Sequence, residues 1–359
     1  MKRVLHQSTQ YTKHFSFPLN KNSVEIRLLT KKGDNIKKVE LVYNDKYKFH
    51  EFVNFKEIFK DELNDEFIQA KLLFAKKVSF LFDIFEHCPL IINQEYRCHI
   101  NNSLYYGINY IKETHPDYYS ELIRMYNNGE IHISNNSTGN AVCDSYTGEI
   151  WLGLSKTILD DLYLVHEFFH HQNLIPINNG TKKESVTREL FGEAISIAAE
   201  LDFCEKITND DLAKDTKIFE IDYINDAVKC ARKIKTELIL IDIYCKHGEI
   251  NDNLIKTFIL ENNNDIGELF SQEYESVLSD ISGWGANLKF YWNLKYVLGI
   301  IFGYYLSDLV KENRENWKII YDINSSIYDL SIEQFLKKIK INLEEEKIVS
   351  IFLEHYNKL

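Results

Sequence analysis

The segment LVHEFFHHQN at residues 164–173 places three histidines and a glutamate inside an otherwise apolar stretch. An α-helix has about 3.6 residues per turn, so His166 and His170 lie one above the other on one face, with Glu167 beside them. The predicted buried side of this helix consists of apolar residues at helical spacing, namely Ile158, Leu162, Val165 and Phe169. We therefore expect a helix that presents two imidazoles and a carboxylate at the edge of a buried face.

Two neutral imidazoles on one helical face can bind a zinc ion, and a carboxylate beside them can take a proton from water. This H-E-x-x-H pattern is typical of zinc peptidases. A catalytic zinc site has three protein ligands and an open position, so His166 and His170 need a third ligand from a later helix. Glu167 is the expected general base. His171 points about 100° away from His170 and is expected to be a polar neighbour.

The segment TRELFGEAISIAAELDF at residues 187–203 is a predicted helix that offers the third ligand. Glu189 and Glu193 are one helical turn apart, and Glu200 lies roughly in line with them. The positions between them are apolar nearly all round, and a buried glutamate needs a partner such as zinc. Spacing alone leaves Glu189 and Glu193 both open as the ligand. It also leaves Glu200 either as a hydrogen-bonding partner of a ligand or as a surface charge.

Composition narrows the class of protein. A chain of 359 residues with 45% hydrophobic and 27% charged residues is ordinary globular protein, long enough for one large domain and a smaller one. The net charge of −12 without a basic block argues against nucleic acid as a partner, and no apolar run is long enough to cross a membrane. The first residues lack the apolar core of a signal peptide, and six cysteines show no C-x-x-C pair. We expect unpaired, mostly buried thiols and a cytoplasmic location.

The first part of the chain has a β-rich texture. Short segments with β-branched and aromatic residues predict strands, namely SVEIRLLT (23–30), KKVELVYN (37–44), EFIQAKLLF (66–74) and KVSFLFDIF (77–85). The stretch RLLTKKGDNIKKVELVYNDKYKF at residues 27–49 resembles the N-terminal sandwich of some glycoside hydrolases, although no sugar-cleaving barrel follows it. We therefore predict a small, sandwich-like β-rich module over residues 1–97.

The remaining residues, 98–359, are predicted to form a mostly helical domain. The first two helices are SLYYGINYIKE (103–113) and PDYYSELIRMYNN (116–128), followed by a loop, ISNNSTGNA (133–141). TGEIWLGL (147–154) predicts an edge strand, which can pair with an extended peptide, and Ser155 is the expected N-cap of the next helix. The fold class is therefore α+β. Four other histidines have no partner at ligand spacing and are predicted to lie on the surface: His99, His115, His132 and His247.

From about residue 115 to the C-terminus the chain resembles the oligopeptidase F and thimet oligopeptidase family of gluzincin zinc peptidases. Residues 138–171 are similar to the family's Gly-Ala-rich loop, substrate-binding strand, Leu-Asp-Asp turn and metal-binding helix, in that order. Glu193, Ser196 and Glu200 repeat the family's E-x-x-S-x-x-x-E spacing, which favours Glu193 over Glu189 as the ligand. FYWNLKYVLGIIFGYYLSDL (290–309) is similar to the family's tyrosine-rich helix that faces the metal.

The resemblance implies a zincin-type catalytic domain that hydrolyses short, unfolded peptides. One zinc ion per chain would be held by His166, His170 and Glu193. KYVLG at 295–299 places Tyr296 where the family has its catalytic tyrosine, with Tyr291 as the second candidate.

Two features depart from the family and leave alternatives. Phe169 replaces the usual glycine before the second histidine and is expected to narrow the approach to the helix. Residues 281–290 lack the histidine that the family carries upstream of its tyrosine-rich helix. One alternative is a processing peptidase for a single partner peptide that the N-terminal module recruits. The other is an inactive, zinc-retaining peptide-binding protein, although the presence of Glu167 argues against it.

Overall fold

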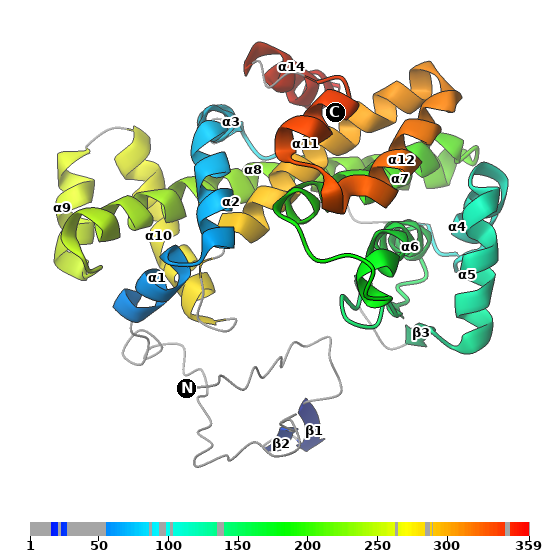
Figure 1. Cartoon of the computed structure of the whole chain (residues 1–359), viewed down its shortest axis with the longest axis horizontal. Helices are drawn as coiled ribbons and strands as arrows, with labels where there is room; N and C mark the ends of the chain where they lie inside the picture. The colour runs from blue at the N-terminus through cyan, green and yellow to red at the C-terminus, as the bar shows by residue number, and fades with distance from the viewer. Residues whose placement is uncertain are drawn as a thin grey trace. The chain divides into compact units, whose positions relative to one another are not determined.

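The computed structural model is mostly helical and contains two small sheets (Figure 1). It describes residues 16–20, 23–26, 55–85, 88–92, 98–100, 103–134, 140–262, 265–283, 288, 290–341 and 345–358. The chain divides into two compact units, of which the first comprises residues 1–69 and 235–290 and the second comprises residues 70–234 and 291–359. All candidate site residues lie in the second unit.

The elements of the first unit are β1 (Ser16–Asn20), β2 (Ser23–Ile26), α1 (Phe55–Leu63), α9 (Asp252–Glu261) and α10 (Asp265–Gly283). Those of the second are α3 (Ser79–Phe85), α4 (Tyr105–Thr114), α5 (Pro116–Asn128), β3 (Ile131–Ser134), β4 (Asn140–Cys143), β5 (Ile150–Gly153), α6 (Leu159–Asn178), α7 (Val186–Lys206), α11 (Phe290–Glu312), α12 (Trp317–Ser326), α13 (Ile332–Lys338) and α14 (Glu345–Tyr356). The helices α2 (Glu66–Lys77) and α8 (Asp210–His247) have residues in both units, and α11 has its first residue, Phe290, in the first unit.

The N-terminal part agrees only in part with the strand predictions. β1 pairs antiparallel with β2, which confirms a strand at residues 23–26. Residues 37–44 and most of the predicted β-rich module lie outside the described part of the chain. The strands predicted at 66–74 and 77–85 are wrong, because these segments form α2 and α3. Their buried residues recur at helical rather than alternating spacing, namely Ile68, Leu72 and Ala75, then Val78, Leu81, Phe82 and Phe85.

The three-stranded sheet has the order β3-β5-β4, with β5 parallel to β3 and antiparallel to β4. The strand predicted at 147–154 is confirmed as β5, but the prediction that it is an edge strand is wrong. Ile150 and Leu152 are buried, so this apolar strand takes the centre of the sheet. The edge strand that packs against α6 is β4, and its first two residues lie in the segment predicted as a loop.

Helix α6 carries the histidine motif and begins later than expected. The Ser155 N–H and hydroxyl both donate to Asp160 Oδ1 at 2.8 Å, and the Lys156 N–H donates to Asp160 Oδ2 at 2.8 Å. Ser155 therefore belongs to a turn that Asp160 organises, and the predicted N-cap is wrong because the helix starts at Leu159. The apolar stripe predicted for this helix is confirmed, since Ile158, Leu162, Val165 and Phe169 are all buried.

The contact between α7 and α11 is unusually close. A Cβ added at Gly299 would lie 2.5 Å from Glu193 Cβ, and one added at Gly303 would lie 2.5 Å from Ile197 Cγ2. A side chain at either glycine would therefore force the two helices apart. This contact determines which residues of α11 lie beside Glu193.

His115 is a core residue, so its predicted surface position is wrong. It is 1% exposed and hydrogen-bonds the Tyr110 hydroxyl through Nε2 at 3.0 Å and the Tyr321 hydroxyl through Nδ1. Burial lowers the pKa of His115 to about 3. The ring is therefore neutral, and the hydrogen bonds of its two nitrogens connect helices α4 and α12.

All six cysteines are unpaired, as expected from the sequence. Only Cys88 and Cys204 are buried, so the expectation of mostly buried thiols is wrong, and Cys245 is exposed. Among the described helices, none has the length and apolar character that crossing a bilayer requires.

Asp161 of α6 connects this helix to α4 through a buried hydrogen bond, and its ionisation can be tested. It is fully buried, it accepts the Gly107 N–H at 2.8 Å, and burial raises its pKa from 3.8 to about 7. The folded state therefore holds this proton more tightly than the unfolded state. The contribution of Asp161 to the free energy of unfolding should be highest below about pH 4 and fall as the pH rises to 7, by on the order of 2–4 kcal/mol.

Asp161→Asn keeps an oxygen for Gly107 and cannot ionise. Urea unfolding at about pH 4.5 and pH 8 should show the variant gaining stability relative to wild type at the higher pH. Asp117→Asn, at an exposed position on α5, is the control and should show no such change. If the difference in stability between Asp161→Asn and wild type were the same at both pH values, the proposed effect of the buried Asp161 carboxyl would be refuted.

Candidate metal centre

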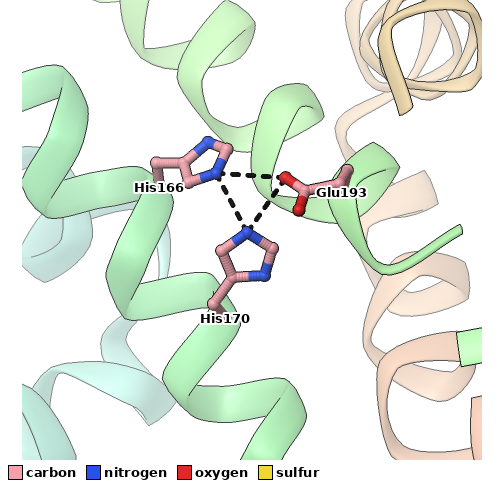
Figure 2. A group of neighbouring side chains, drawn as sticks. All are labelled: His166, His170 and Glu193. Carbon is pink, nitrogen blue, oxygen red and sulfur yellow. Dashed lines mark hydrogen bonds and ion pairs between the residues drawn. The ribbon is translucent and has the colours of Figure 1, made fainter. Parts of the chain in front are cut away.

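Three potential ligand atoms converge between α6 and α7 (Figure 2). His166 Nε2 lies 2.9 Å from His170 Nε2, and Glu193 Oε2 lies 3.3 Å from the first and 3.1 Å from the second. The two imidazoles come from successive turns of α6, while the carboxylate comes from α7. The structure thus brings His166, His170 and Glu193 together as the sequence predicted.

The arrangement of donor atoms fits a zinc ion. His166 Nδ1 lies 2.7 Å from Glu200 Oε2, so Nδ1 donates its hydrogen there and Nε2 is the nitrogen that faces the cluster. Two imidazole nitrogens and one carboxylate oxygen are the ligand set of an open, catalytic zinc site. The residues present can therefore hold this metal with a coordination position left for other molecules.

Glu200 is a partner of His166 rather than a surface charge. Its side chain is fully buried and also accepts a hydrogen bond from the Tyr223 hydroxyl of α8. A carboxylate behind a histidine ligand fixes the ring orientation and makes the imidazole a better donor to a cation. Of the two readings that the sequence left open, the structure favours the hydrogen-bonding one. Tyr223 was not predicted, because no spacing relates α8 to the histidine motif.

Charges at the centre are strongly perturbed. Burial alone would raise the pKa of Glu193, but the Lys295 ammonium and His170 outweigh it and hold that pKa well below its usual range. Burial opposes a charge on His166, yet the Glu200 and Glu193 carboxylates raise its pKa well above the ordinary value. A buried carboxylate that stays ionised between imidazoles is suited to binding a cation.

Glu167 lies beside the cluster, at 9% exposure, and is tied to the neighbouring sheet. Its Oε2 accepts the backbone N–H of Cys143, the last residue of β4, at 2.7 Å. The edge of β4 therefore faces α6 at the level of the expected general base.

The tyrosine-rich segment forms α11, and its two candidate tyrosines lie in different surroundings. Tyr296 is 39% exposed, and desolvation of its hydroxyl with the nearby Glu193 and Glu167 charges raises its pKa well above the usual value. The ring of Tyr291 lies under the Lys71 ammonium, 4.3 Å from the ring centroid. Tyr296 is thus within electrostatic reach of the cluster.

Three other expectations are resolved by contacts. Glu189 pairs with Lys71 and does not join the cluster. His171 contacts the Gly148 carbonyl at 2.7 Å and Glu121 at 3.0 Å, which agrees with a polar neighbour. The expectation that Phe169 narrows the approach is wrong, because its side chain packs in the core, with its ring 5.0 Å from that of His115.

Lys295 is the main residue that the sequence analysis missed. Its Nζ donates to Glu193 Oε1 at 2.8 Å, on the side of the carboxylate away from the histidines. The lysine directly precedes Tyr296 in KYVLG, but only the helix packing shows that it reaches the candidate ligand.

Comparison with known proteins gives two different matches. A sequence profile for the family described as "Alpha amylase, N-terminal ig-like domain" matches residues 1–97, a range that includes the helices α1, α2 and α3. No curated protein matches the chain.

Solved structures resemble most of the chain. A putative oligoendopeptidase F from Bacillus anthracis str. Ames is 11% identical, with a TM-score of 0.50, over 85% of this chain and 55% of that one. A second putative oligoendopeptidase F is 10% identical, with a TM-score of 0.51, over 88% and 58% of the two chains. A structure of PZ peptidase A with an inhibitor is 11% identical, with a TM-score of 0.47, over 89% and 60%.

At these identities the likeness concerns the fold. This chain shares the mostly helical fold of the two oligoendopeptidase F structures, and it spans 55% and 58% of their lengths. The fold that the sequence motifs imply is therefore also the fold of these two structures.

The choice between the two glutamates of α7 can be tested by a matched pair of variants. Glu193→Gln removes the charged oxygen that faces both imidazoles, so zinc affinity should fall by more than the roughly 10–100-fold typical of an outer partner. Glu189→Gln changes a residue that pairs with Lys71 and should keep zinc affinity close to that of wild type. Competition with a chromogenic chelator measures both. Loss of zinc in the Glu189 variant alone would shift the ligand by one helical turn.

Proposed function

We propose that this chain is a zinc-dependent metallopeptidase that hydrolyses short, unfolded peptides, with one zinc ion per chain. The observation that carries the proposal is the convergence of His166, His170 and Glu193, with Glu167 on the same helix and a sheet edge beside it. A metal site that served structure alone would not need an acid–base group next to an open position.

In this proposal His166, His170 and Glu193 hold the metal, and Glu200 keeps the His166 ring in the orientation that the site requires. Bound there, zinc supplies Lewis acidity toward a peptide carbonyl and toward water. The chain's own residues supply the remaining functions, which are proton transfer, substrate positioning and stabilisation of the developing charge.

Glu167 is the proposed general base. It takes a proton from the attacking water and then delivers that proton to the leaving amine. The Cys143 N–H holds one carboxylate oxygen at 2.7 Å, which limits rotation of the side chain. The other oxygen remains available for proton transfer.

The edge of β4 is the proposed binding site for the peptide backbone. Cys143 directs its N–H away from β5 and toward Glu167, and backbone groups two residues apart in a strand point to the same side. The N–H and C=O of Ala141 therefore face the same way as the Cys143 N–H. An extended peptide can pair with them as an added strand, which would hold its backbone next to Glu167.

Tyr296 is the proposed donor to the oxyanion that forms when water attacks the carbonyl. Its ring is partly exposed, and the Glu193 and Glu167 charges act on its hydroxyl. One such donor contributes roughly 100–1000-fold to the rate in comparable sites. Tyr291 stays the second candidate, although its contact with Lys71 gives it a different environment.

A preference for short peptides is supported by the fold shared with proteins called oligoendopeptidases. The alternative of a non-catalytic zinc protein loses one of its two arguments, because Phe169 packs into the core. The sandwich-like module at residues 1–97, its recruiting role in a processing peptidase, and the cytoplasmic location stay predictions.

The role of Glu167 can be tested separately from metal binding. Glu167→Gln keeps the size and the hydrogen bond to the Cys143 N–H, but the amide cannot accept a proton from water. The variant should retain about one zinc per chain and lose on the order of 100–10,000-fold in kcat for a mixed peptide library. Metal analysis and mass spectrometry of the digests measure the two effects.

Glu205→Gln, on the surface of α7, is the matched control and should leave both zinc content and rate unchanged. Chelator-treated wild type should be inactive. If Glu167→Gln cleaved the library at the wild-type rate, the proposed mechanism would be excluded.

A further inference from the structure

Lys295 occupies a position at the centre that the proposed mechanism does not use. Its ammonium donates to Glu193 Oε1 at 2.8 Å, while Glu193 Oε2 faces His166 and His170. Its side chain is only 19% exposed, and its Nζ lies 3.9 Å from the centroid of the Trp292 ring. The lysine is thus held between an aromatic face and a buried carboxylate.

The packing of α11 explains why the lysine reaches this place. Gly299, one turn after Lys295, allows the α11 backbone to contact the Cβ of Glu193. The Lys295 side chain therefore extends along Glu193 rather than into solvent. Its contact with Oε1 leaves only Oε2 directed at the imidazoles, so the carboxylate presents one oxygen to the site.

His166 and Glu193 each have a charged partner on the side away from the cluster, and the two partners have opposite charges. His166 has the anionic Glu200 behind it, and an anion there strengthens the attraction of the imidazole for a cation. Glu193 has a cation behind it. Like charges repel across a poorly hydrated site, so an ammonium on the far side of the carboxylate opposes a second cation on the near side.

The same lysine stabilises the site when no metal is bound. Glu193 is 6% exposed, and an ionised carboxylate with so little hydration is costly unless a cation pairs with it. Lys295 supplies a cation on the side of the carboxylate away from the histidines. Removing its charge would leave Glu193 without its ammonium partner in the metal-free protein and would make a divalent cation the natural replacement.

We propose that Lys295 is a positioning residue that turns one oxygen of Glu193 toward the two histidines, stands in for the metal charge in the metal-free protein, and thereby lowers the affinity of the centre for divalent cations. The inference rests on the metal site of the proposed function. Because Lys295 balances the Glu193 charge, the centre does not need a metal to keep its arrangement. The fraction of chains that carry a metal ion can therefore vary.

The experiment measures zinc affinity and metal-free stability for four variants at one pH. Lys295→Met removes the charge and the donor, Lys295→Gln removes the charge but keeps a donor, and Lys295→Arg keeps both. Lys311→Met is the matched control, since Lys311 joins the same two helices through Glu205 at 2.9 Å, away from the site. Zinc affinity comes from chelator competition and stability from thermal unfolding in chelator.

Lys295→Met and Lys295→Gln should bind zinc at least about tenfold more tightly than wild type, because a repelling charge is gone. Both should have a lower metal-free Tm, and both should gain more in Tm when zinc is added. Lys295→Arg should restore both quantities toward wild type, and Lys311→Met should leave zinc affinity unchanged.

Unchanged or weaker zinc binding in Lys295→Gln, which removes the charge but retains a hydrogen-bond donor, would overturn the inference even if Lys295→Met failed to fold. A wild-type protein that takes up no zinc would instead overturn the proposed metal site. The two failures are therefore distinguishable.

Discussion

A carboxylate buried in the middle of a helix is the constraint on which this structure depends. Glu193 is 6% exposed, and its charge has to be met by neighbouring groups rather than by water. Helix α6 brings His166 and His170 to one oxygen, and α11 brings Lys295 to the other. The glycine at 299 lets α11 approach closely enough for this contact. The packing of three helices is thus organised around one polar side chain.

The same packing connects the centre to the surface that would hold a substrate. Glu167 extends from α6 to the Cys143 N–H, so the position of the expected base depends on the edge of β4. On the other side, the Glu200 carboxylate joins His166 to Tyr223 of α8. The candidate metal ligands, the proposed general base and the proposed peptide-binding edge are therefore held by hydrogen bonds between different elements, and rigid placement of this kind is what catalysis would require.

Local patterns in the sequence predicted the parts of the centre that lie on single helices. The spacing of His166 and His170 could be read from the chain because helical periodicity fixes which residues share a face. Periodicity left Glu189 and Glu193 both open as the third ligand, and only the resemblance to a known family favoured Glu193. Lys295 and Tyr223 could not be predicted, since their positions depend on how distant helices pack. The aromatic composition of residues 66–77 and 79–85 predicts strands, but their buried residues recur at helical spacing and both segments form helices.

The central claim is that His166, His170 and Glu193 bind one metal ion. The most direct test is anomalous diffraction at the zinc absorption edge from a crystal of the zinc-loaded protein. The account predicts a single strong anomalous peak per chain, bonded to Nε2 of both histidines at about 2.0–2.1 Å and to an oxygen of Glu193 at about 2.0–2.2 Å. A peak on other residues, or none at this cluster in protein shown to contain zinc, would contradict it.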